Sequence, residues 1–149
     1  MMHKQGAAMA NTLAHSRVQL SDLADSVIRM ALQEGASDAQ VMFNESTGLL
    51  LEMRQGRLKT RTRASQSSLF LTVYRGHHQG TTSSTNYSSA SLRETVQAAC
   101  RIAGYTGEDR FAGLAEARFL CRASDELDLW HPWNLDEADA TALAQRIEA

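Results

Sequence analysis

Histidines are the side chains of this sequence best suited to metal or acid–base chemistry. The chain has His3, His15, His77, His78 and His131. None of them stands in a His-Glu-x-x-His or His-x-x-Glu-His spacing, which would set two imidazoles on one helix face around zinc. His77 and His78 are adjacent at a turn, so an extended backbone points them to opposite faces. Because a catalytic zinc needs about three converging protein ligands, the spacing predicts no metal-binding residue in this chain.

Nucleophilic chemistry has no better support. The chain contains no Gly-x-Ser-x-Gly elbow and no Gly-x-x-x-x-Gly-Lys phosphate loop. The serines between Ser83 and Ser91 fall at a strand end and a helix start, where backbone capping explains them. Cys100 lies on the apolar face of an expected helix and Cys121 in a strand or loop, so both are interpreted as structural. We therefore expect no catalytic residue.

One strand carries a row of cations. Residues two apart in a strand share a face, so the strand Arg57–Arg63 presents four positive side chains together. These are Arg57, Lys59, Arg61 and Arg63. Such a face could contact phosphates of nucleic acid or an acidic peptide. The favoured interpretation is a solvated face that acids such as Glu45 and Glu52 neutralise.

Two further segments are candidate contact surfaces. The polar strand His77–Thr85 is an expected sheet edge, so Thr81 and Ser83 could contact an extended peptide. Edge protection or subunit contact explains the strand equally well. Trp130 and Trp133 flank a proline, and packing against another domain or a partner is favoured over ligand binding.

Composition describes an ordinary globular chain. Its 149 residues suit one domain, and a hydrophobic content of 43% can build a core. A net charge of −2 provides no general attraction to nucleic acid, which is not expected as a partner. No stretch approaches the roughly 20 apolar residues of a membrane span, and residues 1–18 contain no signal-peptide core. We expect a flexible leader over 1–18, no membrane association and a cytoplasmic location.

The elements that must position these residues alternate between helix and strand. Ser21 and Gly35 bracket an amphipathic helix over 21–34. A second helix starts at the Ser88 cap and ends at Gly104 or Gly107. Strands are expected over 39–45, 49–54, 57–63, 69–75 and 77–85, with turns at 46–48, 55–56 and Gly76. The strand 69–75 is apolar on both faces and is expected to be central. This pattern predicts an α/β (α+β) fold with an antiparallel sheet of about five strands and two or three helices.

The last helix begins with Asp136 as a plausible N-cap and has no stop signal before Ala149. We therefore expect a domain over 19–149 that is truncated in its last helix and belongs to a longer protein.

Several segments follow one another in a recognisable order: Gly35-Ala36-Ser37-Asp38-Ala39, Leu50–Leu58, Val73–Gly76 with Gly80–Thr85, Ser91–Ala99, Ile102–Thr106 with Phe111–Ala115, and Asp128–Pro132. Together they resemble the N-terminal domain of the PmbA/TldD family, on the PmbA/TldE branch. The resemblance covers residues 20–149. Its basic strand at 57–63 departs from the family, where this strand is commonly acidic or mixed.

The resemblance implies a non-catalytic domain in a zinc-dependent peptidase complex of the kind labelled modulator of DNA gyrase. In that family the TldD subunit carries the His-Glu-x-x-x-His zinc site, and the PmbA/TldE subunit is its partner in a heterodimer. The resemblance therefore implies no cofactor in this chain, zinc in the partner, a TldD-like subunit as partner, and a peptide or protein as substrate. A stand-alone binding module that uses Arg57–Arg63 is the alternative.

Overall fold

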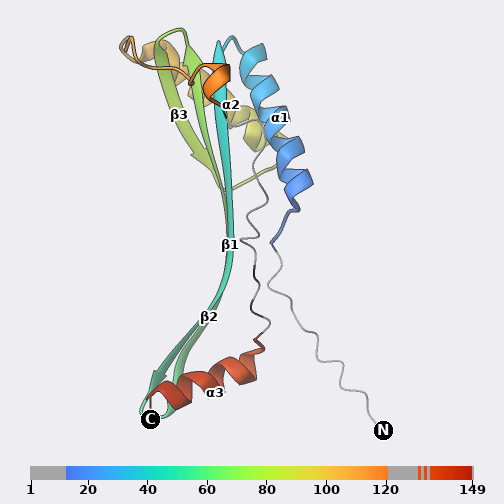
Figure 1. Cartoon of the computed structure of the whole chain (residues 1–149), viewed down its shortest axis with the longest axis vertical. Coiled ribbons are helices and arrows are strands. Elements are labelled where there is room, and N and C mark those ends of the chain that lie inside the picture. Colours follow the sequence, from blue (N-terminus) through green and yellow to red (C-terminus); the bar gives the residue numbers. More distant parts are fainter. Residues whose placement is uncertain (1–12, 121–130, 132, 134, 149) are drawn as a thin grey trace. The chain divides into compact units, whose positions relative to one another are not determined.

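The computed structural model describes residues 13–120, 131, 133 and 135–148. Figure 1 shows the elements in chain order. They are α1 (Arg17–Gln33), β1 (Asp38–Arg54), β2 (Arg57–Arg75), β3 (His78–Ser84), α2 (Ser89–Tyr105), a short 3-10 helix (Ala117–Phe119) and α3 (Glu137–Glu148). The fold is α+β, as predicted from the sequence, with three helices beside one sheet.

The sheet has three strands in the order β1-β2-β3, so the prediction of about five was wrong among the described residues. Two expected breaks do not exist. Gly48 keeps φ outside the positive range, so β1 runs straight through the expected turn at 46–48. Residues 64–68, of which all but Ala64 are polar, likewise continue β2. The predicted turn at Gln55-Gly56 is confirmed: φ values of 53° and 70° are those of a type I′ hairpin turn.

The chain divides into two compact units. Among the described residues, the larger unit is 14–45 with 66–120, and the smaller includes Ser46–Ser65 and α3.

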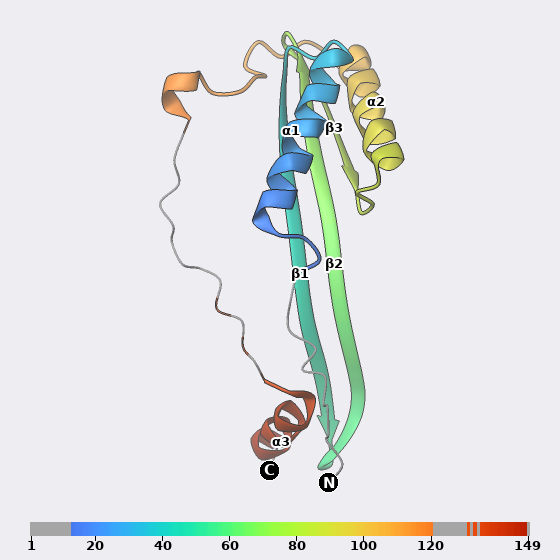
Figure 2. The same ribbon diagram turned by 90° about the vertical axis from the view of Figure 1, so that its right-hand side faces the viewer.

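In the larger unit, α1 and α2 lie side by side on one face of the sheet (Figure 2). Their apolar stripes meet the inward residues of the strands in one core. The most buried large side chains are Val27 of α1, Leu69, Leu71 and Val73 of β2, and Val96 of α2. Cys100 is also buried there, as predicted. β2 is central, as predicted, but its other face is only partly covered because Phe70 remains 43% exposed.

The first helix starts earlier than expected. Ser16, not Ser21, is its N-cap: the Ser16 hydroxyl accepts from the Gln19 N–H and the Gln19 side chain accepts from the Ser16 N–H. This Ser-x-x-Gln capping box places residues 15–18 in the folded unit, so the leader predicted over 1–18 extends too far. Gly35, with φ of 89°, follows the helix as expected.

The second helix confirms its predicted start and corrects its end. Ser91 N–H donates to the Ser88 hydroxyl at 3.4 Å, which is the expected N-cap. The helix ends at Tyr105 with Thr106 as C-cap, so it passes through Gly104 and stops before Gly107.

In the smaller unit, polar contacts at both ends of α3 hold it to the β1–β2 turn region. The Glu148 carboxylate accepts from the Gly56 N–H at 2.9 Å, and Glu137 pairs with Arg61. Asp136 caps the helix, because its carboxylate accepts from the Asp139 N–H at 2.8 Å. This confirms the predicted cap.

Candidate functional site

The row of cations on β2 is partly neutralised. Lys59 pairs with Glu52 across the hairpin at 2.8 Å, and Arg61 pairs with Glu137 of α3. Neither Arg57 nor Arg63 has an ion-pair partner in the part of the chain that the structure describes. The prediction that Glu52 balances this strand is confirmed. The prediction for Glu45 was wrong, because that carboxylate pairs elsewhere.

The pairing reduces the case for a phosphate-binding surface. A phosphate would have to compete with a carboxylate for Lys59 and for Arg61, so fewer cations of the row are available to it. The structure therefore favours the solvated face over a nucleic-acid site.

The predicted edge strand is an edge. β3 pairs antiparallel with β2, and Arg75 and His78 close the two-residue turn between them. In such a ladder hydrogen-bonded and non-hydrogen-bonded pairs alternate. The backbone N–H and C=O groups of Gln79, Thr81 and Ser83 therefore point away from β2, toward the free edge of the sheet. Thr106 confirms this direction, because its hydroxyl donates to the Gln79 carbonyl at 2.9 Å.

Thr81 and Ser83 are therefore placed to receive another strand. Their side chains are exposed, and within the described residues their backbone groups have no partner at the free edge. The Thr81 hydroxyl lies 3.2 Å from that of Thr72, its neighbour across the ladder. Contact with a peptide at Thr81 and Ser83 stays a prediction.

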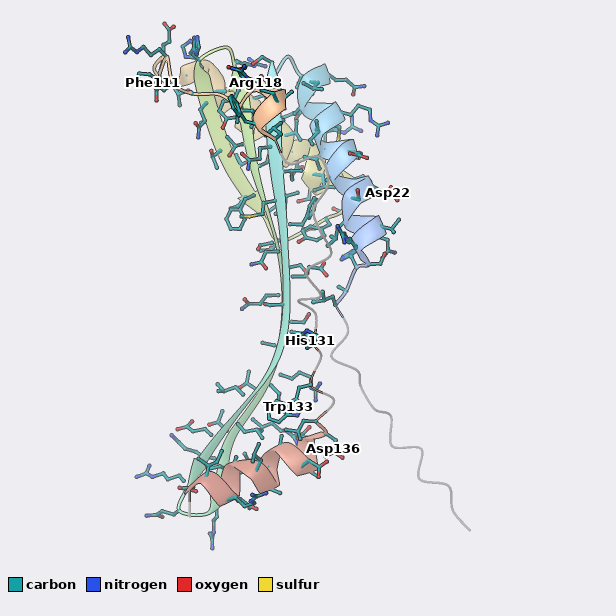
Figure 3. All side chains as sticks on the ribbon, in the orientation of Figure 1. Asp22, Phe111, Arg118, His131, Trp133 and Asp136 are labelled. Atoms are coloured by element: carbon teal, nitrogen blue, oxygen red, sulfur yellow. The ribbon has the colours of Figure 1, made fainter. Side chains whose placement is uncertain are left out.

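The tryptophan loop is only partly described. Trp130 lies outside the described residues, as does Cys121. Trp133 is 65% exposed, and it precedes the Asp136 cap of α3 (Figure 3). Its role in packing against another domain or a partner stays a prediction.

Three of the described histidines, His15, His77 and His78, engage separate partners. His78 Nδ1 lies 2.8 Å from the Thr106 carbonyl, and His77 Nδ1 lies 3.5 Å from the Ala112 carbonyl. His15 contacts Glu45. Over residues 13–120 and the described part of 131–148, no three His, Cys, Asp or Glu side chains gather as metal ligands would. No helix in this part of the chain is long and apolar enough to cross a membrane.

A cluster around Glu45 was not foreseen from the sequence. The Glu45 carboxylate is 2% exposed and accepts from His15 Nδ1 at 2.5 Å and from the His15 N–H at 3.1 Å. The Ser67 hydroxyl lies 3.3 Å from the same carboxylate. Burial alone would raise the pKa of Glu45, but the hydrogen bonds and charge of His15 outweigh it and lower the pKa below 4.5.

Tyr87 completes this cluster from the segment that leads into α2. Its ring lies 5.3 Å from the His15 ring and meets Phe43 edge to face at 5.0 Å. Burial, and then the charge of Glu45, raise the pKa of Tyr87. In the sequence, the Ser16-x-x-Gln19 capping box could have indicated that α1 starts at Ser16, directly after His15. It does not indicate that His15 contacts Glu45.

The chain matches a known family over its central elements. A family model described as PmbA/TldA metallopeptidase domain 1 matches residues 39–103, from β1 to the last turns of α2.

Relatives extend this match over most of the chain. The Escherichia coli O157:H7 protein named Metalloprotease PmbA is 37% identical over 120 residues, which are 80% of this chain and 27% of that protein. A Metalloprotease PmbA homolog of Haemophilus influenzae is 29% identical over 93% of this chain and 31% of its own length. The chain thus spans less than a third of the length of these relatives.

Solved structures support the fold. A putative modulator of DNA gyrase from Bacteroides thetaiotaomicron superposes with a TM-score of 0.65 over 72% of this chain and 24% of its own, at 20% identity. TldE from Thermococcus kodakarensis superposes with a TM-score of 0.58 at 10% identity, over 75% of this chain and 26% of its own. The helix–sheet arrangement, the family match and the PmbA relatives agree, and the chain belongs to the PmbA/TldD family as its N-terminal domain.

Proposed function

We propose that this chain acts as the non-catalytic N-terminal domain of a PmbA/TldE-like subunit in a zinc-dependent peptidase complex. The complex processes peptides or proteins in the cytoplasm, a TldD-like subunit is the partner, and that partner holds the zinc. The observation that carries the proposal is the match of β1 through α2 to the first domain of this metallopeptidase family.

The side chains support a scaffolding role. A zinc peptidase site needs converging ligands and an open coordination position. Here the imidazoles of His15, His77 and His78 contact three different groups. The domain is therefore suited to shaping a complex whose chemistry is performed elsewhere.

The free edge of β3 suggests how the domain positions a substrate. An extended peptide could pair with the outward backbone groups of Thr81 and Ser83 through main-chain hydrogen bonds. Such bonds do not depend on the side chains of the peptide, so they select no particular sequence. Access along this edge would suit an enzyme that handles unfolded peptides.

The test is reconstitution of the full-length protein that carries this domain with a tagged TldD-like subunit. We expect co-purification, zinc in the TldD-like subunit only, and cleavage of an unstructured fluorogenic peptide only when both subunits are present. Removing the imidazoles with His15→Gln, His77→Gln and His78→Gln should leave the zinc content unchanged. Failure to form a complex would refute the partnership, and zinc that disappears with these histidines would refute the non-catalytic assignment.

A further inference from the structure

Helix α2 packs directly on β3 and places one of its flanks beside the free edge of the sheet. The Thr82 hydroxyl donates to the Thr95 carbonyl at 3.2 Å, and a Cβ added to Gly80 would lie 2.1 Å from the Ala99 carbonyl oxygen. The helix backbone therefore contacts β3 closely. One flank of α2 contacts α1, and the opposite flank faces the free edge, because β3 ends the sheet β1-β2-β3.

The helical period identifies the residues on the edge flank. Gln97 marks the side toward α1, because its amide nitrogen lies 3.4 Å from the Glu34 carboxylate at the end of α1. Each residue turns the helix by about 100°, so Ala98 and Ile102 fall on the flank away from α1. Ile102 is 41% exposed, whereas Ala103, which faces the strand, is 1% exposed. An apolar flank made of Ala98 and Ile102 therefore borders the edge of β3.

The edge offers its free hydrogen-bonding groups over a short stretch. The backbone N–H and C=O groups of Thr81 and Ser83 point away from β2 and have no partner among the described residues. At Gln79 the outward carbonyl already accepts from the Thr106 hydroxyl at 2.9 Å. A strand that joins the sheet therefore finds its free backbone partners at Thr81 and Ser83.

The pleat of the sheet decides which side chains of an added peptide meet α2. Residues directly opposite one another in neighbouring strands point to the same face of the sheet. Gly80 and Thr82 face α2. Thr81 faces the other side, where its hydroxyl lies 3.2 Å from that of its neighbour in β2. Peptide residues opposite Gly80 and Thr82 therefore point toward the apolar flank of α2, and the residue opposite Thr81 points to the other face.

We propose that the β3 edge binds an extended peptide that carries apolar side chains at alternate positions, and that Ala98 and Ile102 select them. The inference rests on the proposed role of this edge in substrate positioning and adds a preference that main-chain hydrogen bonds do not supply. An apolar side chain leaves water when it packs against this flank, which favours binding. A polar side chain at the same position meets two hydrocarbon side chains that offer it no hydrogen bond.

The test is titration of the 149-residue chain with two short peptides, followed by NMR of the backbone amides. One peptide alternates Val with Thr and the other contains Thr throughout, so both favour extended structure and differ in methyl against hydroxyl groups. We expect saturable shifts of the Thr81 and Ser83 amides, and binding of the Val/Thr peptide that is about three- to tenfold tighter.

Three variants separate the edge from the flank. Ile102→Gln keeps a good helix former at an exposed position and removes the apolar contact, so the preference for the Val/Thr peptide should disappear. Val18→Gln is the matched control, because Val18 is an exposed apolar residue of α1, and it should keep the parental preference. Thr81→Pro removes an outward N–H and should weaken the binding of both peptides.

The outcomes distinguish this inference from the proposed function. Equal affinities of the parent for the two peptides, or a preference that persists in Ile102→Gln, would overturn the inference and leave β3 as an edge that selects no sequence. Unchanged binding in Thr81→Pro, or no saturable shift at Thr81 and Ser83 with either peptide, would remove the edge from substrate contact altogether and refute both.

Discussion

Gly80 is the residue whose replacement tests the packing of this domain most sharply. It lies in β3, opposite Val73 of β2, and faces α2. A Cβ added at this position would lie 2.1 Å from the Ala99 carbonyl oxygen and 2.6 Å from the Ala103 nitrogen. Carbon–oxygen contacts in proteins are ordinarily about 3.3–3.6 Å, so α2 or β3 would have to move by roughly 1 Å.

The loss of stability in Gly80→Ala follows from the gap that this movement opens between α2 and β3. Ala99 and Ala103 are fully buried, and Val96 and Cys100 pack on the same helix face. A gap of about 0.5–1 Å forfeits a quarter to a half of each dispersion contact across it, and overpacking in cores typically costs about 1–3 kcal/mol. Because the clash is with backbone atoms, we expect Gly80→Ala to lose about 3 kcal/mol. That loss corresponds to a fall in Tm on the order of 10 °C.

Gly48→Ala is the matched control. Gly48 also lies in a strand, is exposed, and has no atom within 4 Å of an added Cβ. There the alanine only reduces the freedom of the unfolded chain, so stability should be unchanged or rise by up to about 1 kcal/mol. The assay is thermal and urea unfolding followed by circular dichroism. Equal Tm values for the two variants would refute the reasoning, and so would rescue by Ala103→Gly, which leaves both backbone contacts in place.

Three further predictions concern the cluster, the edge and α3. Glu45 has a lowered pKa in the folded state, so its stabilisation is complete above pH 4.5 and is lost as the pH falls through the folded value. In Glu45→Gln the free energy of unfolding should therefore fall less steeply as the pH is lowered below 4.5. The substitution should also cost about 1–3 kcal/mol at pH 7, measured by urea unfolding. Thr81→Pro removes an outward N–H and the hydroxyl contact with Thr72 but no ladder hydrogen bond to β2, so it should keep the fold and slow peptide cleavage by the proposed complex. Thr82→Pro breaks the ladder to β2 and should cost more than about 2 kcal/mol. Arg61→Glu should weaken the start of α3 by up to about 1 kcal/mol, seen as faster hydrogen exchange there, and Glu137→Arg should restore it.

Each of these has an outcome that would contradict it. If Glu45→Gln loses stability at low pH as steeply as the parent chain does, His15 does not hold this carboxylate ionised. Cleavage at the parental rate in Thr81→Pro would remove the β3 edge from substrate positioning. Arg63→Glu, at a position without an ion pair among the described residues, should leave α3 exchange unchanged. If Arg63→Glu speeds hydrogen exchange in α3 as much as Arg61→Glu does, the cause is the general change of charge and not the lost contact with Glu137.

Local signals in the sequence predicted most of the elements correctly, because those signals act over a few residues. The apolar stripe through Val96 and Cys100, the Ser88 and Asp136 caps and the positive-φ turn at Gly56 are all present in the structure. These local signals failed where a polar or flexible residue was equally compatible with two conformations. The sequence around Gly48 fits both a strand and a turn, and pairing with the neighbouring strand decides between them.

What the sequence determined by itself was the amphipathic pattern, the central strand, the lack of zinc-ligand spacing and the family resemblance. Each of these depends on residue type and short-range order. What only the tertiary structure decided was which distant side chains meet: His15 with Glu45, Arg61 with Glu137, and Gly80 with the backbone of α2. Such contacts depend on strand register and helix placement, which are set by the packing of the core as a whole, so no local pattern around Glu45 distinguishes a solvated acid from the buried partner of a histidine.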